Sequence, residues 1–171
     1  MINNKSLLNL LEKCNIHYKT TNHEPHFSVQ DTKKQKNLEG GARTKNLFLK
    51  NKKNKFYLFS CLQDTLVNLK KIGKTNNFGN LSFANEDYLL KMLNVKPGSV
   101  TPFGLLNDTN NLIDFYLDEK ITKFSDVNFH PMINTSTLNI RTNDFISFMF
   151  KNNKVVKIFN FDTYTILNGK Q

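Results

Sequence analysis

The strongest structural signal in the sequence is a pair of β-rich segments joined by a short polar turn. Residues 45–50 and 56–62 are rich in leucine and aromatic side chains, and the five residues between them read Asn-Lys-Lys-Asn-Lys. Two such runs around a short polar connection predict an antiparallel hairpin. A single hairpin does not bury a stable core, so the other segments must extend it into a larger sheet.

Helical and strand patterns alternate irregularly along the rest of the chain. Helices are expected after the capping residues Ser6, Ser28, Asn85 and Thr142. Residues 66–72 form a short amphipathic segment. Strands are expected at residues 16–20, 103–106, 113–117, 126–129, 137–140 and 155–161. This order predicts an α/β fold with a mixed sheet and helices packed on it, rather than a doubly wound parallel sheet. Because neither a repeat nor a linker divides residues 1–171, we expect a single domain.

The length and the cysteine content indicate a reduced, soluble protein. A chain of 171 residues buries enough surface to fold without a disulfide or a metal. Cys14 and Cys61 lie in apolar surroundings without CxxC spacing, which is typical of buried thiols. No apolar run approaches the ~20 residues of a membrane span, and a secretory signal is not evident. We therefore expect a cytoplasmic protein, with an organelle as the alternative.

The charge of the chain permits two interpretations. Lys and Arg number 24 against 14 Asp and Glu, which gives a formal net charge of +10 and a pI near 9.6. A pI above about 9 is typical of nucleic-acid-binding domains. The abundance of Asn, Lys, Phe and Ile is equally typical of an AT-rich genome, so charge alone leaves both open.

Two segments have the residue types of an anion or carbonyl site. Lys45 stands where a predicted strand leaves the surface, and its ammonium can reach a phosphate or a carbonyl oxygen, although many such lysines only flank a strand. A loop that can direct backbone N–H groups at an oxyanion is formed by Gly98, Ser99, Val100, Thr101 and Pro102. Pro102 has no N–H, so Ser99, Val100 and Thr101 would donate. A plain connecting loop is the alternative.

His130 precedes Pro131 at a predicted strand end, where it can act as a base, a donor, a pocket wall or a structural residue. His23 and His26 have a short spacing, but no third ligand is evident, so no metal is expected. GxGxxG, Walker, HExxH and GxSxG motifs are absent from the sequence. Neither cysteine has the surroundings of a nucleophile.

The order of these segments resembles the YbaK/ProX family of aminoacyl-tRNA deacylases, over about residues 7–150. The segments that carry the resemblance are His23-Glu24, residues 44–49, Leu81-Ser82-Phe83-Ala84, residues 93–108, Phe129-His130-Pro131 and residues 134–137. The chain is most similar to the branch that deacylates Ala-tRNA(Pro).

The resemblance implies a mixed, partly barrel-like sheet surrounded by helices, and a trans-editing hydrolase that cleaves the aminoacyl ester of mischarged Ala-tRNA(Pro). Lys45 matches the family's essential lysine, and Gly98 to Pro102 match its GxxxP loop. Asn46 and His130 match substrate-binding positions, with His23 in the first loop. The implied partners are tRNA and prolyl-tRNA synthetase, and no cofactor is implied.

Three alternatives stay open. The first is a deacylase for another mischarged tRNA, such as Cys-tRNA(Pro) or a Ser-tRNA. The second is a non-catalytic module that binds tRNA or a synthetase. The third is an unrelated basic RNA-binding protein.

Overall fold

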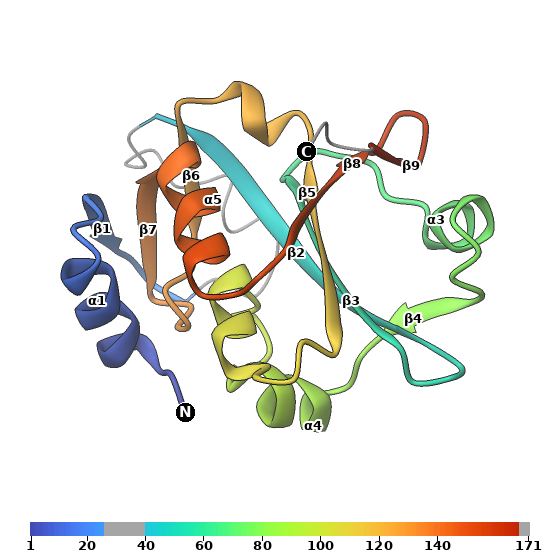
Figure 1. Ribbon diagram of the computed structural model, residues 1–171, viewed down its shortest axis with the longest axis horizontal. Coiled ribbons are helices and arrows are strands. Elements are labelled where there is room, and N and C mark those ends of the chain that lie inside the picture. Colours follow the sequence, from blue (N-terminus) through green and yellow to red (C-terminus); the bar gives the residue numbers. More distant parts are fainter. Residues whose placement is uncertain (26–39, 168–171) are drawn as a thin grey trace.

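The fold is described by a computed structural model for residues 1–25 and 40–167. Within these residues nine strands form one sheet (Figure 1). They are β1 (Tyr18–Asn22), β2 (Ala42–Asn51), β3 (Phe56–Leu62), β4 (Leu81–Phe83), β5 (Ile113–Asp118), β6 (Asp126–Phe129), β7 (Ser136–Arg141), β8 (Val156–Asn160) and β9 (Thr165–Leu167). The strand order is β1-β7-β6-β2-β3-β5-β8-β9, with β4 also paired to β2. β2–β6, β3–β5 and β5–β8 are parallel and the other pairs antiparallel, so the predicted mixed sheet is confirmed.

The predicted hairpin is β2–β3, paired from Thr44↔Leu62 to Lys50↔Phe56. Its turn is held by Asn51, whose Oδ1 accepts the N–H groups of Lys53 and Lys55. β2 begins at Ala42, earlier than predicted, and is long enough to pair with β6 at one end and β4 at the other.

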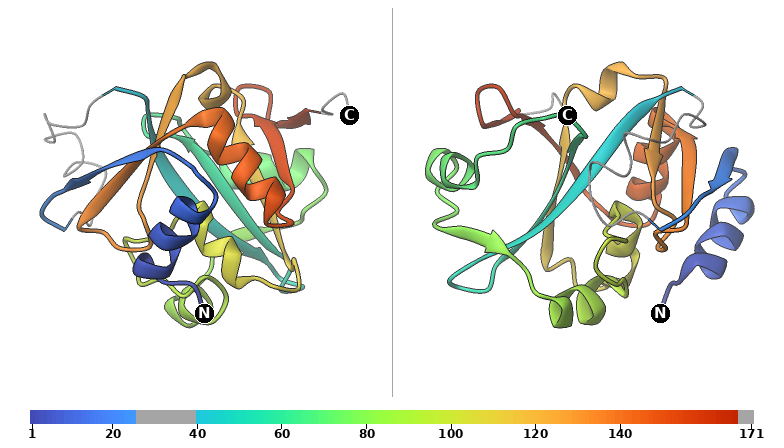
Figure 2. Two further views of the ribbon diagram at one scale, coloured as in Figure 1. Left: turned by 60° about the vertical axis from the view of Figure 1, so that its left-hand side comes forward. Right: turned by 180° about the vertical axis from the view of Figure 1, so that it is seen from behind.

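The core consists of two clusters on opposite faces of the sheet. The first contains Leu7 and Leu11 of α1 (Asn4–Lys13) and Phe145 and Phe148 of α5 (Thr142–Lys151). These two helices cover the same face (Figure 2). The second cluster lies over the hairpin and includes Ile72 of α3 (Leu69–Thr75). β3 contributes to both clusters, which explains its nearly continuous apolar sequence.

The helix starts differ in part from the sequence predictions. Asn3, not Ser6, caps α1: its Oδ1 accepts the Ser6 N–H, while the Ser6 hydroxyl accepts the Asn3 N–H in a capping box. Thr142 does not cap α5, because it is the first helical residue and its buried Oγ1 has no partner among the described residues. Asn85 caps α4 (Glu86–Tyr88) as predicted, and the helix continues in a wider turn, Leu89–Leu93. The predicted helix after Ser28 lies outside the described residues.

The predicted strand at residues 103–106 is wrong, because Pro102–Asn107 form a 3-10 helix. Pro102 at its first turn fixes a helical φ. Gly104 allows close packing, since a Cβ there would lie 2.9 Å from the Cβ of Leu93. The remaining helical turn, Ile121–Lys123, and the short strands β4 and β9 were not predicted.

Along residues 1–25 and 40–167, every helix is too short or too polar to cross a bilayer.

Candidate active site

The candidate site lies where the sheet opens between β2 and β6. These parallel strands pair only at Ala42↔Val127 and Arg43↔Asn128, and then diverge. β2 next meets a strand on that edge at Leu49, which pairs with Phe83 of β4. Among the described residues, the edge of β2 at Lys45, Asn46 and Leu47 therefore faces no strand. Points where neighbouring strands separate are common locations for ligand sites.

Lys45 lies at the start of this unpaired edge, and its side chain is half-buried. Its Nζ donates a hydrogen bond to the carbonyl oxygen of Thr65 at 2.5 Å. Because side chains alternate along a strand, Lys45 shares a face of β2 with Arg43, whose partner across the sheet is Asn128. Lys45 also pairs with Cys61, which belongs to the second cluster, so the ammonium lies on the face opposite α1 and α5.

Cys61 pairs directly with Lys45 across the hairpin. Burial raises the pKa of the Cys61 thiol to about 12, and the charge of Lys45 offsets this only in part. A thiol with so high a pKa is protonated at neutral pH and is a poor nucleophile. Cys61 is fully buried and Cys14 is half-buried.

The Gly98–Pro102 loop reaches β2 through Asn46. The Asn46 Nδ2 donates to the carbonyl oxygen of Val100 at 2.9 Å, and its Oδ1 accepts from the Ser60 hydroxyl at 2.5 Å. The carboxamide thus holds the loop against the middle of the hairpin. In the structure the Asn46 side chain connects two parts of the site, and its binding of substrate stays a prediction.

Within the loop, the structure distinguishes the predicted donors. Gly98 has a φ of +83°, a left-handed conformation that explains why glycine stands there. The Ser99 N–H donates to the carbonyl oxygen of Lys96 at 3.0 Å in this conformation, and its role as an oxyanion donor stays a prediction. The N–H groups of Val100 and Thr101 have no acceptor among the described residues, and the buried Thr101 hydroxyl has none there either. Two backbone donors remain.

The two predicted histidines lie together on the other side of the opening. Their ring centroids are 6.0 Å apart. The His130 Nδ1 donates to the Ser136 carbonyl at 2.9 Å. His23 bonds the Glu24 carbonyl through Nδ1 and the Thr137 hydroxyl through Nε2, at 2.8 and 2.9 Å. Hydrogen bonds to β7 therefore fix the orientation of both rings.

Two asparagines not predicted from the sequence connect the halves of the site. Asn128 of β6 is buried; its Nδ2 donates to the Gly40 and Ala42 carbonyls, and its Oδ1 accepts from Asn139 of β7. The Thr44 hydroxyl donates to the Asn128 carbonyl at 2.7 Å. This network holds the start of β2 against β6, just before the strands separate. An Asn between the apolar residues Val127 and Phe129 of β6 was its only signal in the sequence.

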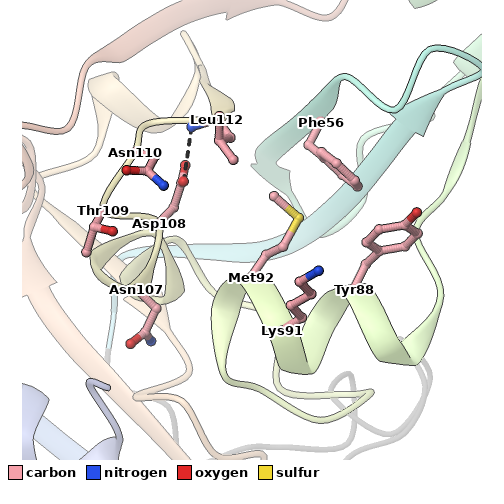
Figure 3. Close-up of a pocket in the computed structure, with 9 residues that line it drawn as sticks. All are labelled: Phe56, Tyr88, Lys91, Met92, Asn107, Asp108, Thr109, Asn110 and Leu112. Carbon is pink, nitrogen blue, oxygen red and sulfur yellow. Dashed lines mark hydrogen bonds between the residues drawn. The ribbon is translucent and has the colours of Figure 1, made fainter.

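A separate cavity of about 310 Å³ lies at the far end of the hairpin (Figure 3). The ring of Phe56 and the side chains of Tyr88, Lys91 and Met92 face it on one side, and residues 107–110 with Leu112 close the other. The Asp108 carboxylate in its wall is occupied by the N–H groups of Leu112 and Ile113. None of the candidate site residues lines this cavity. Across the described chain, no group of three His, Cys, Asp or Glu is arranged to hold a metal.

Comparison with known proteins identifies the family of the chain. The aminoacyl-tRNA editing domain family matches residues 23–148. A prolyl-tRNA synthetase associated domain-containing protein 1 from Xenopus laevis is 36% identical over 163 residues, covering 92% of this chain and 96% of the relative. The prolyl-tRNA editing protein ProX from Acetoanaerobium sticklandii is 34% identical over 133 residues, covering 75% and 79%.

Solved structures share the fold. The crystal structure of a proposed trans-editing enzyme for prolyl tRNA synthetase superposes with a TM-score of 0.67 at 17% identity, over 97% of both chains. That of hypothetical protein APE2540 has a TM-score of 0.67 at 12% identity, over 88% of this chain and 95% of the other. Both confirm the mixed α/β architecture. From the family match and the relatives above 30% identity, the chain belongs to the YbaK/ProX family of aminoacyl-tRNA editing domains.

Proposed function

We propose that this protein is an editing deacylase that hydrolyses the aminoacyl ester of mischarged Ala-tRNA(Pro). The observation that carries the proposal is the hydrogen bond from Asn46 to Val100, because it joins the strand of Lys45 to the Gly98–Pro102 loop. A terminal adenosine lying along the unpaired edge of β2 would meet Lys45 from one face and the loop from the other. Lys45 would bind the terminal phosphate or the ester oxygen by its charge.

In the proposed reaction, water attacks the ester carbonyl and the backbone N–H groups of Val100 and Thr101 stabilise the oxyanion. The carbon–oxygen bond to the ribose then breaks, the ribose oxygen takes a proton, and the amino acid leaves as a free carboxylate. An aminoacyl ester is already activated, so positioning of the water supplies most of the catalysis. Because the described site offers no evident side-chain base, the free ribose hydroxyl beside the ester would orient the water.

The proposed selectivity for alanine is steric. Alanine is smaller than proline, and a pocket of limited volume rejects the larger side chain by clash. His130 and His23 are the proposed walls, since hydrogen bonds to Ser136 and Thr137 fix their rings.

The test is a deacylation assay with Ala-tRNA(Pro), Pro-tRNA(Pro) and Ala-tRNA(Ala). We expect rapid hydrolysis of Ala-tRNA(Pro) and slow hydrolysis of the other two. Cys-tRNA(Pro) and a Ser-tRNA are assayed in the same way, and faster hydrolysis of either would assign a different substrate. Binding of tRNA without hydrolysis of any of these would indicate a non-catalytic module and overturn the proposal.

A further inference from the structure

The positive charge of the chain is concentrated in one segment. Residues 43–84 contain nine Lys and Arg and one acidic residue, Asp64, a formal charge of +8. The whole chain carries +10, so all other residues together contribute only +2. A genome-wide bias towards lysine acts on the entire chain and does not explain why acidic residues are nearly missing from one part of it. A local excess of this kind indicates a binding surface for a polyanion.

The fold gathers these lysines at one end of the molecule. The turn of the β2–β3 hairpin carries Lys52 and Lys53, and α3 carries Lys70, Lys71 and Lys74; all five are exposed. The turn, α3 and β4 lie together at the end opposite α1 in both the front and rear views (Figures 1 and 2). We call these five lysines and the groove described next the basic end.

The lysines of α3 are poorly compensated within the protein. Lys70 and Lys74 are four residues apart on one helix face, where like charges destabilise a helix by a few tenths of a kcal/mol. Among the described residues, neither they nor Lys52 and Lys53 form an ion pair with a carboxylate. The charges are therefore available to an external partner.

A groove separates the hairpin turn from the segment that follows α3. Its volume is about 540 Å³, and it is lined by Asn51, Lys52, Lys53, Lys55, Tyr57, Asn76, Asn77, Phe78, Gly79 and Asn80. The Asn51 Nδ2 donates to the Phe78 carbonyl oxygen at 2.9 Å. The rings of Phe78 and Tyr57 stack with their centroids 4.5 Å apart. These contacts hold the two walls of the groove in place. Lys55 is paired with Asp114, but the ammonium groups of Lys52 and Lys53 are not paired with a carboxylate among the described residues and suit phosphate oxygens.

The groove and Lys45 lie on the same face of the hairpin. Lys45 pairs with Cys61 and Leu49 pairs with Tyr57, so alternation directs these four side chains to one side. Asn51 lies six positions after Lys45 in β2, about 20 Å along the strand. A nucleic acid whose 3′ end reaches Lys45 would therefore extend over α3 towards the groove.

We propose that the basic end binds the phosphate backbone of the acceptor stem that carries the aminoacylated 3′ end. This inference rests on the proposed function and adds the surface that holds the substrate's duplex. An anionic membrane fits the geometry less well. The apolar face of α3 is already used, since Ile72 is fully buried in the second cluster, and membrane-surface helices insert that face into lipid.

The test replaces four lysines of the basic end together: Lys52→Gln, Lys53→Gln, Lys70→Gln and Lys74→Gln. The matched control removes the same charge from other exposed sites: Lys5→Gln, Lys13→Gln, Lys123→Gln and Lys151→Gln. Each protein is assayed on mischarged tRNA and on an aminoacylated CCA trinucleotide, which has no stem. We expect KM for tRNA to rise at least tenfold in the first variant, with kcat and the trinucleotide kinetics within twofold of wild type. The control should match wild type on both substrates.

A binding experiment tests the same surface without catalysis. Affinity for an uncharged acceptor-stem minihelix is measured against salt concentration, and the slope should become shallower by about one for each phosphate that a lysine no longer neutralises. A variant that binds the minihelix as wild type does, or whose KM for tRNA is unchanged, overturns the proposal. Equal losses on tRNA and trinucleotide overturn it too, because they locate the effect at the ester.

The outcome also separates this inference from the proposed function. If wild type hydrolyses neither substrate, the deacylase proposal fails. The minihelix slopes then decide alone whether the basic end binds RNA. Tighter binding to phosphatidylserine vesicles than to the minihelix, abolished in the basic-end variant, would identify a membrane surface and overturn the assignment to RNA.

Discussion

At the scale of single residues, Lys45 is the most exacting test of the candidate site. Lys45→Met keeps the length of the side chain and removes the charge, so we expect kcat/KM for deacylation to fall about 100-fold or more. Within residues 1–25 and 40–167 the ammonium bonds one carbonyl, that of Thr65, so we expect the unfolding free energy to change by less than about 2 kcal/mol.

The control for Lys45 is Lys50→Met, on the same strand. Lys50 is also half-buried, and its Nζ bonds the Asn54 side chain in the hairpin turn. The Lys50→Met variant should retain kcat/KM within twofold of the wild-type value. Wild-type turnover by Lys45→Met would exclude the lysine from the reaction.

Two variants test whether the hydrogen bond from Asn46 to the loop matters for catalysis or only for the fold. Asn46→Ala removes both the bond to Val100 and the bond to Ser60, whereas Ser60→Ala removes only the second. Displacement of catalytic groups by about 1 Å can cost 100-fold in rate, so we expect kcat to fall at least tenfold in Asn46→Ala and less than threefold in Ser60→Ala. Single-turnover deacylation measures both. Equal losses of kcat in the two variants would show that the hydrogen bond from Asn46 to the loop does not contribute to the rate.

Some of these residues could be identified from the sequence and others could not. Lys45, Asn46 and His130 belong to short contiguous segments, so a family resemblance was sufficient to single them out. Asn128 and Asn139 contribute through the pairing of β6 with β7 and of β6 with β2, between strands that are distant in the chain. The engagement of the Ser99 N–H was also invisible, because it depends on the conformation of the turn at Lys96.

At the scale of elements, local patterns predicted the hairpin well and the Pro102–Asn107 segment badly. The hairpin is specified by its own residues, including the Asn51 side chain that closes the turn. The apolar sequence after Pro102 fits a buried strand or a buried helix equally well, and periodicity does not separate them over so few residues. Packing against Leu93 decides in favour of the helix.

Gly104→Ala tests that packing. The new Cβ would lie 2.9 Å from Leu93 Cβ and 3.2 Å from its carbonyl oxygen, so one helical segment must move. We expect a loss of about 1–3 kcal/mol in unfolding free energy, larger than the gain that alanine gives in an unstrained helix. Urea denaturation measures it, with Ser82→Ala at an exposed position as the control. Unchanged stability would show that the two segments have room to separate.

At the scale of the whole molecule, the ion pairs of one carboxylate connect three neighbouring strands of the sheet. Asp114 of β5 forms ion pairs with Lys55, just before β3, at 3.0 Å and with Lys157 of β8 at 2.7 Å. Burial raises the pKa of Asp114, but the hydrogen bonds and charges of Lys157 and Lys55 outweigh it and leave the pKa below its ordinary value of 3.8. The ion pairs therefore favour the folded state whenever the carboxylate is ionised.

Asp114→Asn should reveal this contribution through its pH dependence. A carboxyl whose pKa is lower in the folded state stabilises the protein above its unfolded pKa and loses that effect as pH falls through the folded value. We expect the variant to be less stable than wild type by about 1 kcal/mol at pH 7, because the pairs are partly exposed. The difference should shrink as pH falls below about 4 and disappear once the carboxyl is protonated in the folded state as well.

Urea denaturation at a series of pH values measures the difference between Asp114→Asn and wild type. Asp162→Asn, which removes a single exposed pair with Lys120, is the control and should show a smaller difference at pH 7. A difference for Asp114→Asn that stays constant down to pH 2 would mean that the variant lost packing rather than charge. A difference that grows with acid would reverse the sign of the pKa shift, since it requires a carboxyl that is more easily protonated in the folded sheet than in the unfolded chain.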